Sequence, residues 1–76
     1  MNKQRRTRIE EVIATLDGIY EVLNDLECEE QQALDNMPES FQESERGERM
    51  QEIIDSLSSA AGYLDEAQEE LRNAIE

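Results

Sequence analysis

Apolar residues recur at intervals of three and four positions through both halves of this chain, and this repeat limits its possible folds more than any other feature. In an α-helix such spacing places the side chains on one side. With Ile9 as position a of a seven-residue repeat, positions a, d and e are mainly apolar in the first half, and the second half repeats this with Met50 as a. The repeat predicts two long amphipathic helices. The apolar residues of the first are Ile9, Val12, Ile13, Leu16, Ile19, Tyr20, Leu23, Leu26, Ala33 and Leu34, and those of the second are Met50, Ile53, Ile54, Leu57, Ala60, Ala61, Leu64, Ala67, Leu71, Ala74 and Ile75.

The only strong helix-breaking signal lies in the middle of the chain, where Pro38 follows Met37. Proline has no backbone N–H, and it disfavours helical backbone at the residue before it. We therefore predict a helix over 7–36, a connection over 37–44 and a second helix over 45–75.

Polar residues mark the ends of these helices. Thr7 followed by Glu10 matches the capping box, which sets the predicted start of the first helix. Ser44 is the predicted cap of the second helix. Residues 38–42 are expected to form one short helical turn, with Phe41 closing the apolar end of the pair.

A reversal in the connection brings the two helices together in antiparallel orientation. Facing residues then have numbers that add up to about 80, which places Leu23 near Leu57. The same sum places the bulky Tyr20 beside the small residues of the SSAAG segment, 58–62. The predicted fold class is all-α: a single domain, 1–76, folded as an antiparallel two-helix coiled-coil hairpin.

The apolar stripe is wider than one partner helix can cover. Positions a and d suffice for a two-helix contact, but here the e positions and two g positions, Val22 and Tyr63, are also apolar. Association of two hairpins into a four-helix bundle would cover the excess, so we expect a homodimer. Each copy carries a net charge of -13, and the dimer should therefore tighten as salt rises. The predicted oligomer interface consists of Ile13, Tyr20, Ile54, Ala61 and Tyr63.

The charge is distributed unevenly along the chain. Four cations precede the first acid, and from Ile9 onward 20 acids stand against three arginines. Such a surface repels nucleic acid and anionic membranes and attracts basic proteins. No segment approaches the run of about 20 apolar residues that a membrane span needs. A lone cysteine forms no internal disulfide, so the expected location is the cytoplasm.

The residue types that carry most catalysis and metal binding are missing. There is no histidine, no phosphate-binding glycine loop and only one cysteine, Cys28, which we expect to be an exposed, inert thiol. The neighbouring acids lack the loop pattern of a calcium site. The sequence therefore predicts a protein that is not an enzyme and has no catalytic residue, metal ion or cofactor. Glu30, an acid at position a, is predicted to pair with Arg46 or Arg49 near the connection.

Carboxylates form rows along the outer sides of both predicted helices. Such rows on a rigid rod imitate the charge of a nucleic-acid backbone and can compete for a basic groove. Acidic helices are also common because Glu favours helix and keeps small proteins soluble, and both interpretations stay open. The predicted partner-binding residues of this acidic face are Glu10, Glu11, Asp17, Glu21, Asp25, Glu52, Asp55, Asp65, Glu66, Glu69 and Glu70.

The segment from Asp35 to Met50, DNMPESFQESERGERM, followed by a heptad helix of Ile, Leu and Ala, resembles a group of small uncharacterised acidic proteins encoded by phages and mobile elements of Gram-positive bacteria. In that group an N-P-E-x-x-Q-x-S-E-R-like connection joins two helices rich in Glu and Ala. The resemblance carries no known activity, so it transfers no site residue. It implies a short phage protein that acts by binding in the cytoplasm of the bacterial host, a context that includes anti-CRISPR-like inhibitors.

Two functions remain open from the sequence. The first is an inhibitor or regulator whose acidic helices occupy a basic, nucleic-acid-binding surface of a host or defence protein. The second is a structural oligomerisation or scaffold hairpin that acts through its apolar stripe. Charge reversal of the outer acids should abolish the first activity and spare the second, whereas Ile54→Glu should do the opposite.

Overall fold

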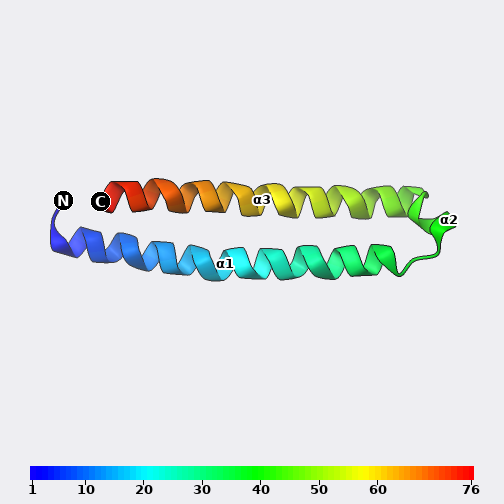
Figure 1. The fold of residues 1–76 in the computed structure, drawn as a ribbon, viewed down its shortest axis with the longest axis horizontal. Coiled ribbons are helices and arrows are strands. Elements are labelled where there is room, and N and C mark those ends of the chain that lie inside the picture. The colour runs from blue at the N-terminus through cyan, green and yellow to red at the C-terminus, as the bar shows by residue number, and fades with distance from the viewer.

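Two long helices make up almost the whole chain in the computed structural model, which describes all 76 residues. Helix α1 spans Lys3–Asp35, the short helix α2 spans Glu39–Gln42, and helix α3 spans Glu45–Ile75. The all-α prediction is confirmed. Helices α1 and α3 lie side by side and run in opposite directions, with both termini at one end and α2 at the other (Figure 1). The molecule measures 58 × 15 × 13 Å, so it is a rod.

Helix α1 begins before the residue that the sequence indicated. The side chain of Asn2 caps it, because the Arg5 N–H donates a hydrogen bond to Asn2 Oδ1 at 2.8 Å. The predicted start at Thr7 is wrong: the Thr7 hydroxyl lies inside the helix and donates to the Lys3 carbonyl at 3.1 Å. Asparagine is as good an N-cap as threonine, and nothing between the two residues breaks a helix.

The connection follows the prediction more closely. Pro38 precedes α2, the predicted short helical turn, with a φ of -56° that suits a residue before the first turn. Ser44 caps α3 as predicted, since the Gly47 N–H donates to Ser44 Oγ at 3.4 Å. The Ser44 hydroxyl in turn donates to the Phe41 carbonyl.

A close backbone approach fixes the end of the rod at the connection. The Gln42 side chain donates to the Met37 carbonyl at 2.9 Å and to the Asp35 carbonyl at 3.5 Å. Gly47 is buried against the Gln42 backbone, and a Cβ atom added to it would collide with the Gln42 carbonyl group. Phe41 is 56% exposed, so it does not close the apolar end as predicted.

The contact surface between α1 and α3, called the seam below, follows positions a and e rather than a and d. The d residues Val12, Ile19 and Leu26 stay 47, 44 and 43% exposed. On α3 the e positions include Ile54 and Ile75, whereas the d positions hold one isoleucine and three alanines, so burying e removes more apolar area from water. Buried or half-buried seam residues are Ile9, Ile13, Leu16, Tyr20, Leu23, Glu27, Glu30 and Leu34 on α1, and Gly47, Met50, Ile54, Leu57, Ala61, Leu64, Gln68, Leu71 and Ile75 on α3.

Candidate protein-binding surfaces

One contact across the seam fixes the register of the two helices. The side-chain nitrogen Nε2 of Gln68 donates to the Ile13 carbonyl at 3.1 Å and to Asp17 Oδ1 at 2.7 Å. These pairs have residue numbers that add up to 81 and 85, slightly above the predicted value of about 80. Gln68 is only 2% exposed, so its amide must find its partners within the protein, and these two bonds fix the register.

The sequence interpretation missed Gln68 and instead predicted an ion pair of Glu30 with Arg46 or Arg49. Glu30 is half-buried but forms no ion pair, and Arg49 contacts the exposed Glu52 instead, at 3.1 Å. A glutamate at the edge of a seam can extend its carboxylate into water, so it needs no cation. The sequence did contain a sign of the role of Gln68, because this residue stands at position e, seven residues after Ala61 and seven before Ile75.

The residues of the predicted acidic face occupy positions b, c and f of both helices apart from Glu70, and only Asp17 among them makes a hydrogen bond across the seam. Asp17 belongs to the contact with Gln68, and Glu70 stands at position g, on the other side of α3. The single ion pair of the chain joins Glu52 to Arg49, and every other carboxylate lacks a cation within salt-bridge distance. The acids therefore present an unneutralised surface along the rod.

Four of the five residues predicted for the oligomer interface lie in the seam of the single chain. Ile54 and Ala61 are each 5% exposed, and Ile13 and Tyr20 are half-buried. Only Tyr63, which is 71% exposed, is free to contact another molecule. The exposed apolar side chains are a different set.

Those exposed apolar residues gather on one long side of the rod. Successive residues of an α-helix are rotated by about 100° around its axis. Around the helix, positions d and g therefore lie next to a on one flank of the seam, and positions b and f lie next to e on the other flank. Helices in antiparallel orientation are related by a half-turn about an axis perpendicular to the plane of the pair, which brings the d and g positions of both to the same side. We call this side the apolar face. Its apolar residues are Val12, Ile19, Val22, Leu26 and Ala33 from α1, and the half-buried Ile53 and Ala60 with the exposed Tyr63, Ala67 and Ala74 from α3.

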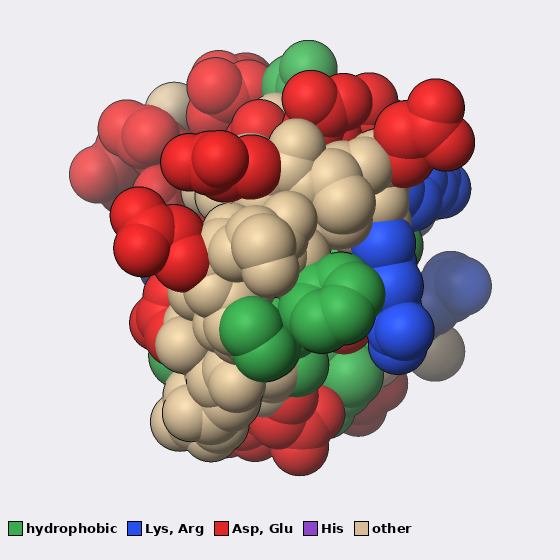
Figure 2. All heavy atoms as spheres, turned by 90° about the vertical axis from the view of Figure 1, so that its right-hand side faces the viewer, with side chains coloured by type: hydrophobic (Ala, Val, Ile, Leu, Met, Phe, Trp, Pro, Cys, Tyr) green, Lys and Arg blue, Asp and Glu red, His purple; other side chains and the backbone are tan.

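The charges of the apolar face differ in sign from those of the rest of the surface. Its d and g positions hold four arginines, Arg5, Arg8, Arg46 and Arg49, against two of the 20 acids, Glu29 and Glu70. In the view from the connection end, basic side chains gather mainly on one side, both near and far, whereas acidic side chains cover the top, bottom and opposite side (Figure 2). The apolar face is therefore flanked by cations at both ends.

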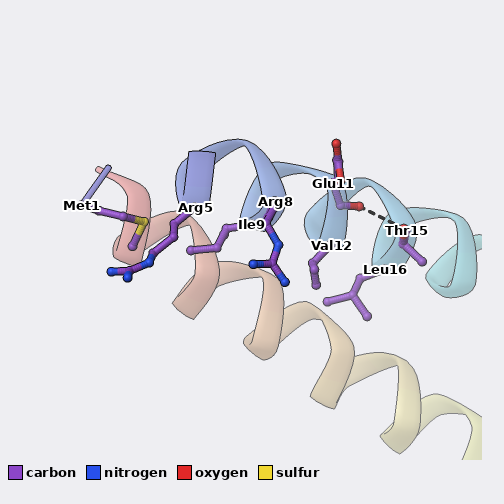
Figure 3. Close-up of a pocket in the computed structure, with 8 residues that line it drawn as sticks. All are labelled: Met1, Arg5, Arg8, Ile9, Glu11, Val12, Thr15 and Leu16. Carbon is purple, nitrogen blue, oxygen red and sulfur yellow. Dashed lines mark hydrogen bonds between the residues drawn. The ribbon is translucent and has the colours of Figure 1, made fainter. Parts of the chain in front are cut away.

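At the terminal end, this face forms an open groove of about 590 Å³. Met1, Ile9, Val12 and Leu16 supply its apolar atoms. Figure 3 shows the Arg5 and Arg8 side chains extending on the same side of α1 as Val12 and Leu16, and Glu11 pointing away. The other lining residues are Arg5, Arg8, Glu11 and Thr15.

The remaining features bear on chemistry and membranes. Cys28 is exposed, and nowhere do three or more Cys, Asp or Glu side chains gather in a way that could hold a metal ion. None of the helices is both long and apolar enough to cross a membrane. Comparison with protein-family models, with curated proteins and with solved structures gives no match to this chain.

Proposed function

We propose that this chain is a non-enzymatic protein-binding module whose acidic outer surface occupies a basic, nucleic-acid-binding surface of another protein. In this proposal it is a phage-type inhibitor or regulator, and its target is a host or defence protein, as for anti-CRISPR-like proteins. The observation that supports the proposal is the row of exposed carboxylates without cationic partners at positions b, c and f.

The density of this charge is comparable to that of a nucleic-acid strand. Thirteen net negative charges over a length of 58 Å give one per about 4.5 Å, against one per about 3.4 Å in a DNA strand. The helices hold their carboxylates on a rigid support, so a partner does not have to order them on binding. A basic groove would gain fast, salt-sensitive association with such a rod.

Competition with nucleic acid tests this function. The tagged chain is used to capture proteins from a lysate of a Gram-positive host, and a double-stranded DNA oligonucleotide is then added. We expect captured proteins with basic nucleic-acid-binding surfaces, released by the oligonucleotide and by raised salt. Captured proteins that lack such a surface, or that DNA does not release, would contradict the proposal.

A matched pair of variants separates the position of the charges from their number. One variant carries Glu10→Gln, Glu21→Gln, Asp25→Asn, Glu66→Gln and Glu69→Gln on the outer surface. The control neutralises equally many acids elsewhere, at Glu27, Glu29, Glu30, Glu39 and Glu43. We expect the first to lose capture and the control to keep most of it.

The second candidate function is a structural oligomerisation or scaffold hairpin, the arrangement in which two coiled-coil hairpins form a four-helix bundle. The exposed apolar residues Val12, Ile19, Val22, Leu26 and Tyr63 favour it. Ile54→Glu is a poor test, because Ile54 is buried in the seam and its replacement would unfold the single chain. A test must use residues of the apolar face instead.

A further inference from the structure

We propose that the apolar face is the contact surface for a second copy of this chain, so that two hairpins stack through it with their acidic surfaces outward. The inference rests on the second candidate function. It names the residues and the partner: the side of the rod that carries Val12, Ile19, Leu26 and Tyr63, and an identical chain.

The exposed area of the single chain is the first argument. A compact monomer of 8.8 kDa exposes about 4,800 Å². This chain exposes 5793 Å², about 1,000 Å² more, and only five of its 76 residues are buried. A standard protein interface removes about 800 Å² from each partner. One interface with one further copy therefore brings the chain to the exposure expected of a compact protein.

The charge distribution is the second argument. The chain as a whole carries -13, but the apolar face carries four arginines and two glutamates, a net charge of +2. The remainder of the chain therefore carries -15. Two copies that meet through the apolar face direct these acidic remainders away from each other, whereas a contact between their acidic sides would press acid against acid. An unrelated basic partner would be attracted to the acidic sides, not to this face.

The sizes of the side chains are the third argument. On α1 the face presents large residues, Val12, Ile19 and Leu26, while on α3 the d positions are Ile53 and the alanines 60, 67 and 74. If α1 of one copy lies over α3 of the other at the same level of the rod, Val12 and Ile19 meet the alanines at 67 and 60, as in close-packed layers, and Leu26 meets Ile53. The groove at the terminal end is then covered by the second copy.

The test is the mass of the chain in solution, measured by sedimentation equilibrium from micromolar to millimolar concentration at low and high salt. We expect twice the chain mass of 8.8 kDa, with tighter association at high salt because the acidic remainders repel. A mass of one chain under all conditions, or a closed assembly larger than two copies, would overturn the inference.

Paired variants locate the interface. Ile19→Glu with Leu26→Glu should reduce the mass to that of one chain. The control, Ala14→Glu with Gln32→Glu, adds the same two charges at exposed positions away from the apolar face and should leave the dimer intact. Circular dichroism checks that both variants keep their helix content. Dissociation of both, or of neither, would overturn the assignment of the face.

A single substitution covers the case in which the double variant does not fold. Tyr63 is 71% exposed in the single chain, so Tyr63→Glu leaves the seam untouched. We expect it to weaken dimerisation by roughly tenfold or more, whereas an unchanged dissociation constant would contradict the inference. The mass measured by sedimentation does not depend on whether the acidic surface binds a target. If the chain does not dimerise, the DNA competition experiment therefore still tests the first proposed function on its own.

Discussion

The two ends of the rod are built differently. At the connection end, the Gln42 side chain, the Ser44 cap and the close approach of Gly47 bind adjacent segments to one another within a few residues. Toward the termini, the sole hydrogen-bonded contact between the helices is that of Gln68 with Ile13 and Asp17. The reversal is therefore rigidly specified, while the distant ends of the helices depend on apolar contacts and one buried amide.

The largest expected effect is at Gly47. A Cβ atom there meets the Gln42 carbonyl, so Gly47→Ala must shift backbone rather than a flexible side chain, and we expect a loss of about 3 kcal/mol of unfolding free energy. Urea denaturation followed by circular dichroism measures it. Gly62→Ala in the same helix is the control, since nothing lies within 4 Å of its added methyl group. Equal stability of the two variants would show that the connection relaxes at little cost.

The next effect concerns Gln68. Gln68→Ala removes both bonds across the seam, leaves the Ile13 carbonyl and Asp17 without this donor, and opens space inside the seam. We expect a loss of about 2 kcal/mol in the same denaturation experiment. Gln51→Ala on the same helix removes only an exposed bond to Asp55 and should change stability by less than about 0.5 kcal/mol.

Combining Gln68→Ala with Asp17→Ala sharpens this result. If the bond between the two residues is the source of the effect, the double variant should lose less than the sum of the two single losses, by about 1 kcal/mol. Strict additivity would mean that Gln68 acts through packing alone. The prediction that the register depends on the buried amide would then fail.

The sequence indicated the helices, the reversal and the Ser44 cap, because the apolar repeat, Pro38 and a serine before a helix are all local signals. It did not indicate which side of the stripe forms the seam. Positions a, d and e are all apolar, so the spacing of apolar residues is the same whether a and d or a and e form the seam. Which of the two pairs is buried depends on the sizes of the side chains in the other helix. The identity of the exposed apolar residues follows from that choice, so the interface predicted from the sequence named mainly seam residues.

The same ambiguity concealed Gln68. A glutamine at position e has no special meaning while e is regarded as the outer edge of the stripe, but in the seam it is a buried polar group that must find partners. Asp17 was assigned to the acidic face for the same reason. The exposed rows of acids, in contrast, needed no knowledge of the seam, since solvated carboxylates follow directly from the sequence.

The caps of the two long helices offer a smaller contrast between the ends. Ser44→Ala removes a cap at the tightly built connection, and we expect a loss of about 1 kcal/mol. Asn2→Ala removes the equivalent cap at the terminal end, where the first turn of α1 can fray without opening the seam, so the global loss should stay below about 0.5 kcal/mol. Amide hydrogen exchange should show the effect of Asn2→Ala confined to the first turn. A larger loss for Asn2→Ala than for Ser44→Ala would reverse the comparison.

The last expected effect has the opposite sign, because it is a gain in stability. Gly18 and Gly62 lie within helices, and an added Cβ atom meets nothing within 4 Å at either position. Alanine restricts the unfolded chain and favours helix, so Gly18→Ala and Gly62→Ala should each stabilise the fold by about 0.5–1 kcal/mol. The two stand on separate helices at positions c and f, outside both the seam and the apolar face, so their effects should add. Thermal denaturation of the single and double variants measures this. If either substitution destabilised the chain, the fold would need a glycine at that position as it does at position 47. The connection would then not be the only tightly packed part of the rod.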